Sequence, residues 1–287
     1  MEEVNAKGQT LKEFLEEYDE TKYRRPSNTV DMILMTVSQA KLKLLLIRRK
    51  DHPFINDWAL PGGFINFDED METAVKRELA EETNITSDTY FRQLYTFGKT
   101  DRDPRTRIIT TAYLSLTPEE NIRHTRAGDD AADAGWFRIS KNIISTDGNG
   151  RSSQVVLECE DNGVRIVYDV YDRVNQNYIH TDSKLNETES NAKLAADHIK
   201  AVNMAMDQVQ HRAASTGILF NLLPLEFTLR EVQNAYEAVI GKKTDTGNFR
   251  RDIRKMLNET GTKKKVNGKY AALYRFNPLY SYMEENL

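Results

Sequence analysis

Residues 63–85 read GFINFDEDMETAVKRELAEETNI and place a glycine-led loop before a helix expected over residues 70–82. Glu78, Glu81 and Glu82 lie at positions i, i+3 and i+4, so their carboxylates share one face of that helix. Adjacent carboxylates repel one another, and a hard divalent cation with oxygen ligands offsets that repulsion. Three glutamates taken alone are more often a solvated acidic face, which is the alternative interpretation.

The positions around these glutamates favour the metal interpretation. Gly62 and Gly63 precede the helix and allow the backbone to approach a phosphate closely. Arg77 lies four residues before Glu81 and can orient that carboxylate. The acidic stripe borders the apolar Val75, which puts it at the rim of the buried face. The sequence therefore predicts a site where Mg²⁺ or Mn²⁺ meets a diphosphate, with Arg77 and the three glutamates as its catalytic group.

The whole stretch resembles a Nudix box, which reads Gly, five residues, Glu, seven residues, then Arg-Glu-apolar-any-Glu-Glu-any-Gly-apolar. The matching positions are Gly63, Glu69, Arg77, Glu78, Leu79, Glu81, Glu82 and Ile85. Asn84 stands where the family has Gly, and Asn is the next best residue for a left-handed helix end. The resemblance implies cleavage of a nucleoside diphosphate joined to another group. It also implies metal ligation by Glu78, Glu81 and Glu82, with Glu82 or a carboxylate outside the box activating water.

Segments outside the box resemble the branch of the family that handles ADP-ribose. They are HPF at 52–54, WALPGGF at 58–64 and DRDPR at 101–105. Arginine can bind a phosphate through two parallel hydrogen bonds, and an aromatic ring can pack a base or a sugar. The candidate ligand-binding residues are Gly62, Gly63, Phe64, Arg48, Arg49, Arg102, Arg105 and Trp58. The alternatives are a solvated strand edge for the arginines and a place in the core for Trp58 and Phe64.

The C-terminal part of the chain has a separate organisation. Thr228 and Glu231 form a capping box that begins a helix ending at Gly241, and a second helix is expected over residues 246–259. Residues 263–276 then read as a β-hairpin. Two helices and a hairpin in this order predict a winged helix-turn-helix.

This C-terminal part is basic, whereas the rest of the chain is acidic. Residues 242–275 hold eleven Lys or Arg against three Asp or Glu, a net charge of +8. The whole chain carries −4, so the remaining residues carry −12. A basic helix face and wing suit the groove and phosphates of double-stranded DNA. The candidate DNA contacts are Asn248, Arg250, Arg251, Arg254, Lys255, Lys264, Lys265 and Lys269. A solvated basic surface, or a module for dimerisation or protein interaction, is the alternative.

Several short segments resemble the Nudix-related transcriptional regulators of NAD metabolism. They are ADHI at 196–199, NLLP at 221–224, FTLREVQ at 227–233, NFRR at 248–251 and LYRF at 273–276. The resemblance implies a homodimer on a paired operator, with a DNA affinity that changes on binding ADP-ribose, and a structural role for His198 between domains. Tyr270-Ala271 departs from the Arg-Pro pair that relatives usually carry there. Many relatives have a decayed box, so the intact glutamates of this chain imply retained metal binding and hydrolysis.

Together these features predict an α+β chain: a Nudix fold, with a mixed sheet sandwiched by helices, followed by a small winged helix-turn-helix. Strands are expected at 29–37, 42–47, 91–97, 107–116, 135–139, 154–160 and 164–171. Other segments are helices at 10–19 and 192–213, a loop at 121–133 and a mobile connection at 181–191. The expected domains are an N-terminal helical segment (1–28), a Nudix domain with hairpin extension and linking helix (29–213) and the winged helix (214–287).

Cysteine content and hydropathy bear on the compartment. Cys159 is the single cysteine, so an internal disulfide is impossible, which fits a reducing compartment. The polar, acidic N-terminus lacks the zones of a signal peptide. No apolar run approaches the ~18 residues that span a bilayer. We therefore expect a cytoplasmic protein without membrane contact.

Overall fold

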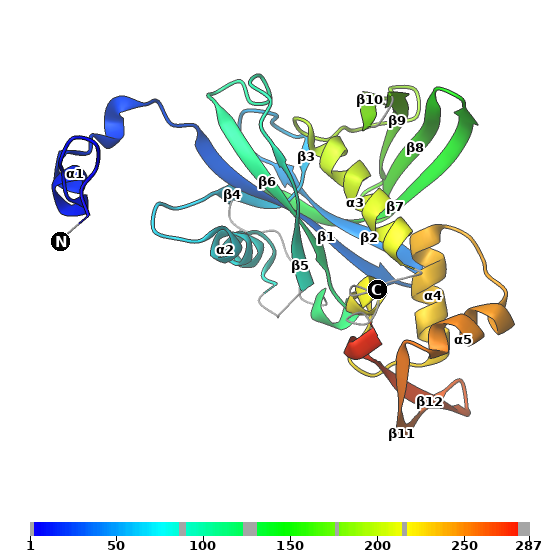
Figure 1. Ribbon diagram of the computed structural model, residues 1–287. Helices are drawn as coiled ribbons and strands as arrows, with labels where there is room; N and C mark the ends of the chain where they lie inside the picture. Colours follow the sequence, from blue (N-terminus) through cyan, green and yellow to red (C-terminus); the bar gives the residue numbers. More distant parts are fainter. Residues whose placement is uncertain (1–2, 86–89, 123–130, 176–177, 214–216, 281–287) are drawn as a thin grey trace.

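The computed structural model describes residues 3–85, 90–122, 131–175, 178–213 and 217–280 (Figure 1). Its strands are β1 (Ser27–Ser38), β2 (Lys41–Arg49), β3 (Trp58–Ala59), β4 (Gly62–Phe64), β5 (Tyr90–Phe97), β6 (Ile108–Leu116), β7 (Ala131–Asp147), β8 (Gly150–Cys159), β9 (Val164–Asn175), β10 (Tyr178–Leu185), β11 (Leu257–Val266) and β12 (Lys269–Phe276). Its α-helices are α1 (Leu11–Glu17), α2 (Met71–Thr83), α3 (His198–Arg212), α4 (Leu229–Ile240) and α5 (Thr246–Arg254). Short 3₁₀ turns are η1 (Glu20–Lys22), η2 (Glu119–Ile122) and η3 (Gly217–Leu222).

One mixed sheet forms the centre of the molecule. Its strands follow the order β10-β9-β8-β7-β2-β1-β6-β5, with β3 beside β2 and β4 beside β1. The β1–β6 pair is parallel, whereas β1–β2, β2–β7 and the β7–β10 ribbon are antiparallel. This arrangement confirms the mixed sheet expected from the sequence.

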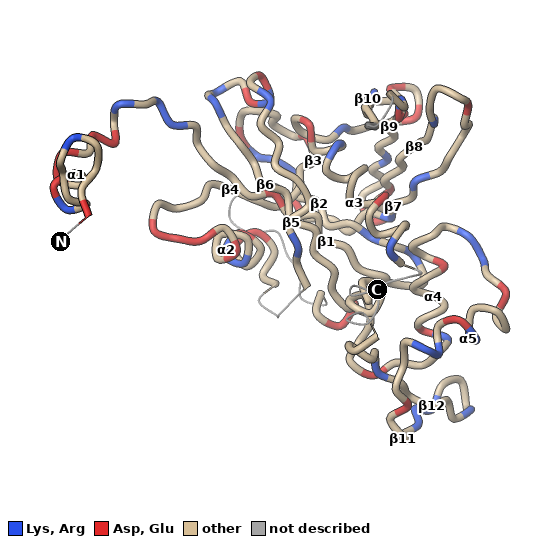
Figure 2. The backbone as a smooth tube through the Cα atoms, viewed as in Figure 1, with Lys and Arg blue, Asp and Glu red and all other residues tan. Residues whose placement is uncertain are grey.

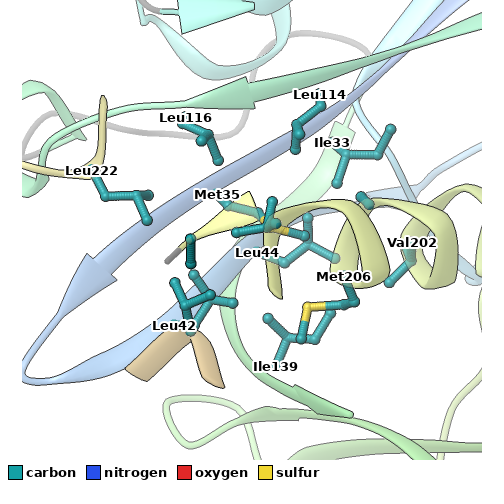
Figure 3. Close-up of a cluster of buried hydrophobic side chains, with 14 of the residues drawn as sticks. Ile33, Met35, Leu42, Leu44, Leu114, Leu116, Ile139, Val202, Met206 and Leu222 are labelled. Carbon is teal, nitrogen blue, oxygen red and sulfur yellow. The ribbon is translucent and has the colours of Figure 1, made fainter. Parts of the chain in front are cut away.

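Strand β1 supplies apolar side chains to both faces of the sheet, because successive residues of a strand point to opposite sides. Met32 and Leu34 pack in the cluster that contains Val75 and Leu79 of α2. Met35, from the other face, belongs to the cluster that contains helix α3. Figure 3 shows Val202 and Met206 of α3 among the sheet side chains of that second cluster. Helices α2 and α3 therefore cover opposite faces, and the sheet is buried between them.

The predicted box helix is present as α2, and its end confirms the expectation for Asn84. This residue adopts the left-handed conformation, with φ 58° and ψ 21°. Its backbone N–H donates to the carbonyl of Ala80 at 2.9 Å. A side chain that tolerates this conformation thus ends the helix where the family places glycine.

The linking helix is shorter than predicted, because its first residues pair with another segment. Helix α3 begins at His198 rather than at residue 192. The N–H of Trp58 donates to Lys193 O at 3.0 Å, and the N–H of Ala195 donates to Trp58 O at 2.8 Å. These bonds hold residues 193–195 extended against β3, so the helix cannot start earlier.

The extension of the sheet is larger than predicted. Strand β7 runs from Ala131 to Asp147 rather than over 135–139. The expected connection at 181–191 is wrong in its first half, since residues 181–185 belong to β10 and pair with β9. The polar sequence of β10 suits an edge strand, whose outer side faces solvent. Of the loop expected at 121–133, residues 123–130 lie outside the described residues and 131–133 belong to β7.

The C-terminal part has the predicted two helices and wing. Helix α4 carries the capping box of Thr228 and Glu231 and ends at Gly241, with φ 71°. Helix α5 ends at Arg254 rather than at residue 259, because residues 257–259 pair with β12 and lengthen the wing. The order of helix, helix and hairpin is confirmed.

The winged part and the central sheet share one hydrophobic core. Leu222 of η3, Val232 of α4 and Phe249 of α5 belong to the same buried cluster as Ile33 and Leu44 of the sheet. Helix α1 instead stands away from the body, as Figure 1 shows, and has no buried residue. Among the helices in the described part of the chain, none is long and apolar enough to cross a membrane.

Candidate functional site

A cavity of about 500 Å³ lies between the start of α3 and the glycine-led loop before α2. It brings together most of the predicted ligand and catalytic residues. These are Gly62, Gly63, Phe64, Arg49, Arg102, Arg105, Arg77, Glu78, Glu81 and Glu82. Residues far apart in sequence thus meet in one place.

Arg77 is the centre of the acidic side of this cavity. Its Nη1 donates to Glu78 Oε1 at 2.7 Å and to Glu81 Oε2 at 3.0 Å. Its Nε donates to Glu69 Oε2 at 3.0 Å, and its Nη2 donates to Glu69 Oε1 at 2.5 Å. Nη2 also donates to the Phe64 carbonyl at 2.9 Å. One guanidinium therefore holds three carboxylates of the box and fixes the loop to the helix.

These contacts shift the acidities of the groups involved. Hydrogen bonds from Arg77 and from a backbone N–H lower the pKa of Glu69. Burial raises the pKa of Glu78, and the opposing effect of Arg77 does not fully compensate. Hydrogen bonding to Glu69 in turn raises the pKa of Arg77, which stays charged. The cluster carries more carboxylates than its single arginine neutralises, which favours the binding of a cation.

The two glycines bring the loop against the carboxylates. A Cβ on Gly62 would lie 2.1 Å from the carbonyl oxygen of Val30. The N–H of Gly62 donates to Glu82 Oε2 at 2.6 Å. A Cβ on Gly63 would lie 2.3 Å from Glu78 Oε1. The clash at Gly62 would be with backbone, whereas the clash at Gly63 would be with the end of the Glu78 side chain. The two glycines thus allow the loop to pack directly against the glutamates.

The donor set of the site fits a hard divalent cation. Glu78, Glu81 and Glu82 all line the cavity and supply carboxylate oxygens, the ligands that Mg²⁺ prefers. Gly63 leaves room for the Glu78 carboxylate where a side chain would exclude it. The residue types therefore suit a cation, but in this arrangement the three carboxylates are bonded to Arg77 and to the Gly62 N–H. Among the described residues no three His, Cys, Asp or Glu are gathered closely enough to hold a cation, so binding one would require these glutamates to reorient.

The basic side of the cavity consists of arginines with different partners. Arg49 Nε donates to the Pro53 carbonyl at 2.8 Å. Arg105 binds Asp103 through two hydrogen bonds of 3.0 and 2.9 Å. Its guanidinium also lies 5.6 Å from the ring centroid of Phe64. An arginine stacked on an exposed ring is a surface on which a base or a sugar can pack.

Two of the predicted ligand residues do not line the cavity. Trp58 is 2% exposed and packs edge-to-face on Phe137, with the ring centroids 4.8 Å apart. The core position considered for Trp58 is therefore the one it occupies. Arg48 points to solvent on the opposite side of β2 from Arg49 and donates to Asn56. The alternation of a strand places only one of two adjacent arginines in the cavity.

The cavity also contains Asp31, which sequence reasoning missed, and His198, for which a structural role between domains was expected. Asp31 accepts a hydrogen bond from Thr110 Oγ1 at 2.8 Å and lies 4.0 Å from His198 Nε2. His198 Nδ1 accepts the N–H of Leu60 at 2.9 Å, and burial lowers the pKa of this histidine. Asp31 does interrupt an otherwise apolar strand, which is a signal that the sequence offered.

The eight predicted DNA contacts form an exposed surface on α5 and the wing. All of them are exposed, whereas Phe249 and Ile253 on the other side of α5 are buried. Figure 2 shows Lys and Arg positions on the β11–β12 hairpin. Lys264 Nζ lies 3.2 Å from Glu231 Oε1, and Arg251 Nε lies 2.9 Å from Asp252 Oδ1. Helix α5 therefore packs against the rest of the module on its buried side and carries basic residues on its exposed side.

Two family models match successive parts of the chain. Residues 25–158 match the NUDIX domain, and residues 219–276 match the NrtR DNA-binding winged helix domain. Most of the residues that line the cavity, including the three glutamates of the box, fall within the first match. Helices α4 and α5 and the wing fall within the second.

Individual proteins give the same assignment. The chain is 28% identical to the ADPR responsive transcriptional repressor NtrR of Acinetobacter baylyi over 267 residues, 92% of this chain and 87% of that protein. It is 35% identical to an ADP-ribose pyrophosphatase of Methanocaldococcus jannaschii over 132 residues, 45% of this chain and 73% of that protein.

A solved structure shows the same likeness over most of the chain. The crystal structure of Shewanella oneidensis NrtR complexed with a 27mer DNA is 26% identical, with a TM-score of 0.61. The match covers 88% of this chain and 95% of that chain. The chain therefore belongs to the NrtR family, in which a NUDIX domain is followed by an NrtR DNA-binding winged helix domain.

Proposed function

We propose that this protein is a transcriptional regulator that binds double-stranded DNA through its winged helix and responds to ADP-ribose bound in its Nudix cavity. The observation that carries this proposal is that a cavity lined by carboxylates and arginines shares one hydrophobic core with a basic winged module. The relative from Acinetobacter baylyi is an ADPR-responsive repressor by name, and the Shewanella oneidensis protein was crystallised with DNA.

In this proposal the arginines of the cavity bind the two phosphates of the ligand. Arg49, Arg102 and Arg105 line the cavity and can each donate more than one hydrogen bond to an oxyanion. Phe64, with Arg105 over its ring, packs against the base or a ribose. The backbone at Gly62 and Gly63 lies close enough to meet a phosphate, because neither residue has a Cβ.

The winged module reads DNA with α5 and the wing. Asn248, Arg250, Arg251 and Arg254 face the groove, and the lysines of the wing lie over phosphates. We also propose that the protein acts as a homodimer, because a two-fold dimer matches a paired operator. The domain boundaries in this proposal are 1–28, 29–213 and 214–287.

A binding titration tests the regulator. A fluorescein-labelled DNA fragment from upstream of the protein's own gene is titrated with protein, with and without ADP-ribose, and anisotropy is recorded at several salt concentrations. We expect binding that weakens steeply with salt and a DNA affinity that changes several-fold with ADP-ribose. No binding at low salt, or a DNA affinity indifferent to salt, would contradict the proposal. Sedimentation velocity tests the homodimer.

We further propose that the protein hydrolyses ADP-ribose or a similar nucleoside diphosphate. The specific observation in favour is that Glu78, Glu81, Glu82 and their organising Arg77 are all present in the cavity. Water would add to one phosphorus and the bridging P–O bond would break, which yields AMP and ribose 5-phosphate. Bound at the three glutamates, Mg²⁺ or Mn²⁺ would lower the pKa of water and neutralise the diphosphate. In this proposal Glu82, which is 8% exposed and accepts the Gly62 N–H, takes the proton that the attacking water loses.

Release of AMP in the presence of Mg²⁺ or Mn²⁺ tests this second activity. Glu82→Gln should reduce it at least 100-fold, a loss typical of a general base. Glu72→Gln, an exposed position on the same helix outside the cavity, is the matched control and should keep wild-type activity. No AMP after long incubation of the wild-type protein would leave the site as a ligand sensor without turnover and would refute the hydrolase proposal.

A further inference from the structure

Arg102 occupies an unusual position in the cavity wall. Its side chain is only 7% exposed, and its Nη2 binds Asp197 Oδ1 at 2.9 Å and lies 3.8 Å from Asp31 Oδ2. Its Nε is buried and has no hydrogen-bond partner among the described residues. A buried guanidinium N–H without an acceptor is rare in a folded protein. The arginine is therefore incompletely satisfied, and it lines the cavity.

The partner of Arg102 is the residue that precedes helix α3. Asp197 stands at the N-cap position, and α3 runs from His198 to Arg212. Near the other end of the helix, Gln210 Nε2 donates to the Val239 carbonyl of α4 at 3.1 Å. At a rise of 1.5 Å per residue, about 20 Å of helix separates the two contacts. One rigid element thus connects the ligand cavity to the winged module.

The middle of α3 is held to the sheet extension. Lys141 of β7, whose side chain is 2% exposed, donates to both oxygens of Asp207 at 2.6 and 2.7 Å. Arg151 and Asp172 lie in the same cluster, so two cations face two carboxylates there. The positive and negative charges of this cluster are equal in number, and none of its four residues lines the cavity. By contrast, the partner of Asp197 is Arg102, which also lines the cavity. A ligand bound there can therefore compete with Asp197 for the guanidinium.

Electrostatics favour such competition. Arg102 is one cation between two carboxylates, those of Asp31 and Asp197. A diphosphate brings two further negative charges and strong acceptor oxygens into the same low-dielectric space. A phosphate oxygen that takes the unpaired Nε repels Asp197 and weakens its bond to the guanidinium. The end of α3 is then free to shift, and the shift reaches α4 through a helix that does not bend easily.

We infer that Arg102 is the ligand-sensing residue: a diphosphate in the cavity draws it away from Asp197, which releases the start of α3 and changes the placement of the winged module. The inference rests on the proposed function and names the contact that couples its two sites. Arg102 acts as a positioning residue for α3 in the absence of ligand and as a phosphate ligand in its presence. The Asp197 bond belongs to the ligand-free arrangement.

The substitution Asp197→Asn separates this role from a merely structural one. It removes the competing charge and leaves Arg102 in the cavity. ADP-ribose should then bind about tenfold more tightly, the size expected for one charge-assisted hydrogen bond. DNA affinity should lose most of its dependence on ADP-ribose. Damage to the fold would instead weaken ligand binding, so the direction of the change is decisive. Asp182→Asn, an exposed aspartate 3.8 Å from Arg173, is the matched control.

The experiment measures ADP-ribose affinity by calorimetry and DNA affinity by anisotropy for the full-length wild-type and variant proteins. Arg102→Lys is the second variant. This variant keeps the positive charge but loses the planar guanidinium with its several donors. ADP-ribose should therefore bind about tenfold more weakly, and it should change the DNA affinity less than in the wild type. Coupling is reciprocal, so the factor by which ADP-ribose changes DNA affinity must equal the factor by which DNA changes ADP-ribose affinity.

The outcomes distinguish this inference from the proposed function. If the wild-type protein binds DNA and responds to ADP-ribose, while Asp197→Asn binds and responds as the wild type does, the inference is wrong and the regulator stands. Weaker ADP-ribose binding by Asp197→Asn also overturns the inference, because the pair would then support the cavity rather than compete with it. If ADP-ribose leaves the DNA affinity of the wild-type protein unchanged, the proposed function itself fails.

Discussion

The contact of Gly63 with Glu78 predicts the effect of adding one methyl group to the site. In Gly63→Ala the new Cβ would lie 2.3 Å from Glu78 Oε1, whereas ordinary contacts begin at 3.4 Å. The carboxylate must therefore move by about 1 Å. Gly63 has no left-handed backbone angle that alanine would resist, and the end of a glutamate side chain is flexible. We expect the strain to displace Glu78 and to leave the backbone in place.

The displacement weakens the 2.7 Å bond between Glu78 and Arg77, whose net contribution is about 1–2 kcal/mol at this partly exposed pair. The melting temperature should then fall by about 2–6 °C. Loss of one of three carboxylate ligands should weaken Mn²⁺ binding by about 10- to 100-fold. Calorimetry with Mn²⁺ and ADP-ribose measures the affinity, and a thermal melt measures the stability.

Gly148→Ala provides the control for this experiment, because nothing lies within 4 Å of a Cβ at Gly148. It should change neither the melting temperature nor the Mn²⁺ affinity. A Gly63→Ala protein that binds Mn²⁺ within twofold of the wild type would refute the proposed role of Glu78 as a ligand. A fall of more than 10 °C would show that Glu78 is held rigidly and that the strain enters the backbone.

Three further predictions concern the core, the wing and the turn between α4 and α5. Trp58→Ala should destabilise the protein by about 3–5 kcal/mol, measured by denaturant unfolding, because Trp58 fills the core rather than the cavity; a loss of ligand affinity without loss of stability would contradict this. Lys265→Ala should weaken DNA binding alike for specific and unrelated sequences and reduce the salt slope by about one, measured by anisotropy; an unchanged slope would remove Lys265 from the phosphate contacts. Glu237, bonded to Lys243 and to the backbone of Thr244, has its pKa lowered to about 2. A lowered pKa in the folded state stabilises the protein above the ordinary pKa of 4.5, and this stabilisation is lost as the pH falls toward 2. The difference in unfolding free energy between the wild type and Glu237→Gln should therefore shrink over that range, and a constant difference would contradict the role of Glu237.

The features that the sequence predicted well depend on residues close together in the chain. The spacing of Glu78, Glu81 and Glu82 fixes their common helix face, and no tertiary contact is needed to infer it. The capping box of Thr228 and Glu231 is equally local. The strands expected at 154–160 and 164–171 are present as β8 and β9, and the residues between them, Asp161-Asn162-Gly163, suit a tight hairpin. These elements account for α2, the start of the winged module and much of the sheet.

The features that the sequence did not predict depend on residues that meet only in the folded chain. Leu194 pairs with Trp58, more than a hundred residues earlier, and this pairing shortens α3. The alternation of β2 requires that one of Arg48 and Arg49 faces away from the cavity, but the face is set by packing against β3 and β7. Asp31 and His198 become neighbours only when α3 crosses the sheet. Composition and periodicity carry no information about such encounters.

The hydrophobic core that continues from the sheet through η3 into α4 and α5 bears on how such a regulator can be re-engineered. Phe220 stacks on both Phe227 and Phe276, with ring centroids 5.5 and 4.5 Å apart, and all three rings belong to or pack against that core. A DNA-reading module cut out at η3 would leave these rings exposed and prone to aggregation. A foreign module grafted onto this sheet would need side chains that complete the shared hydrophobic core. Substitutions on the exposed face of α5 can alter DNA specificity and leave this core unchanged.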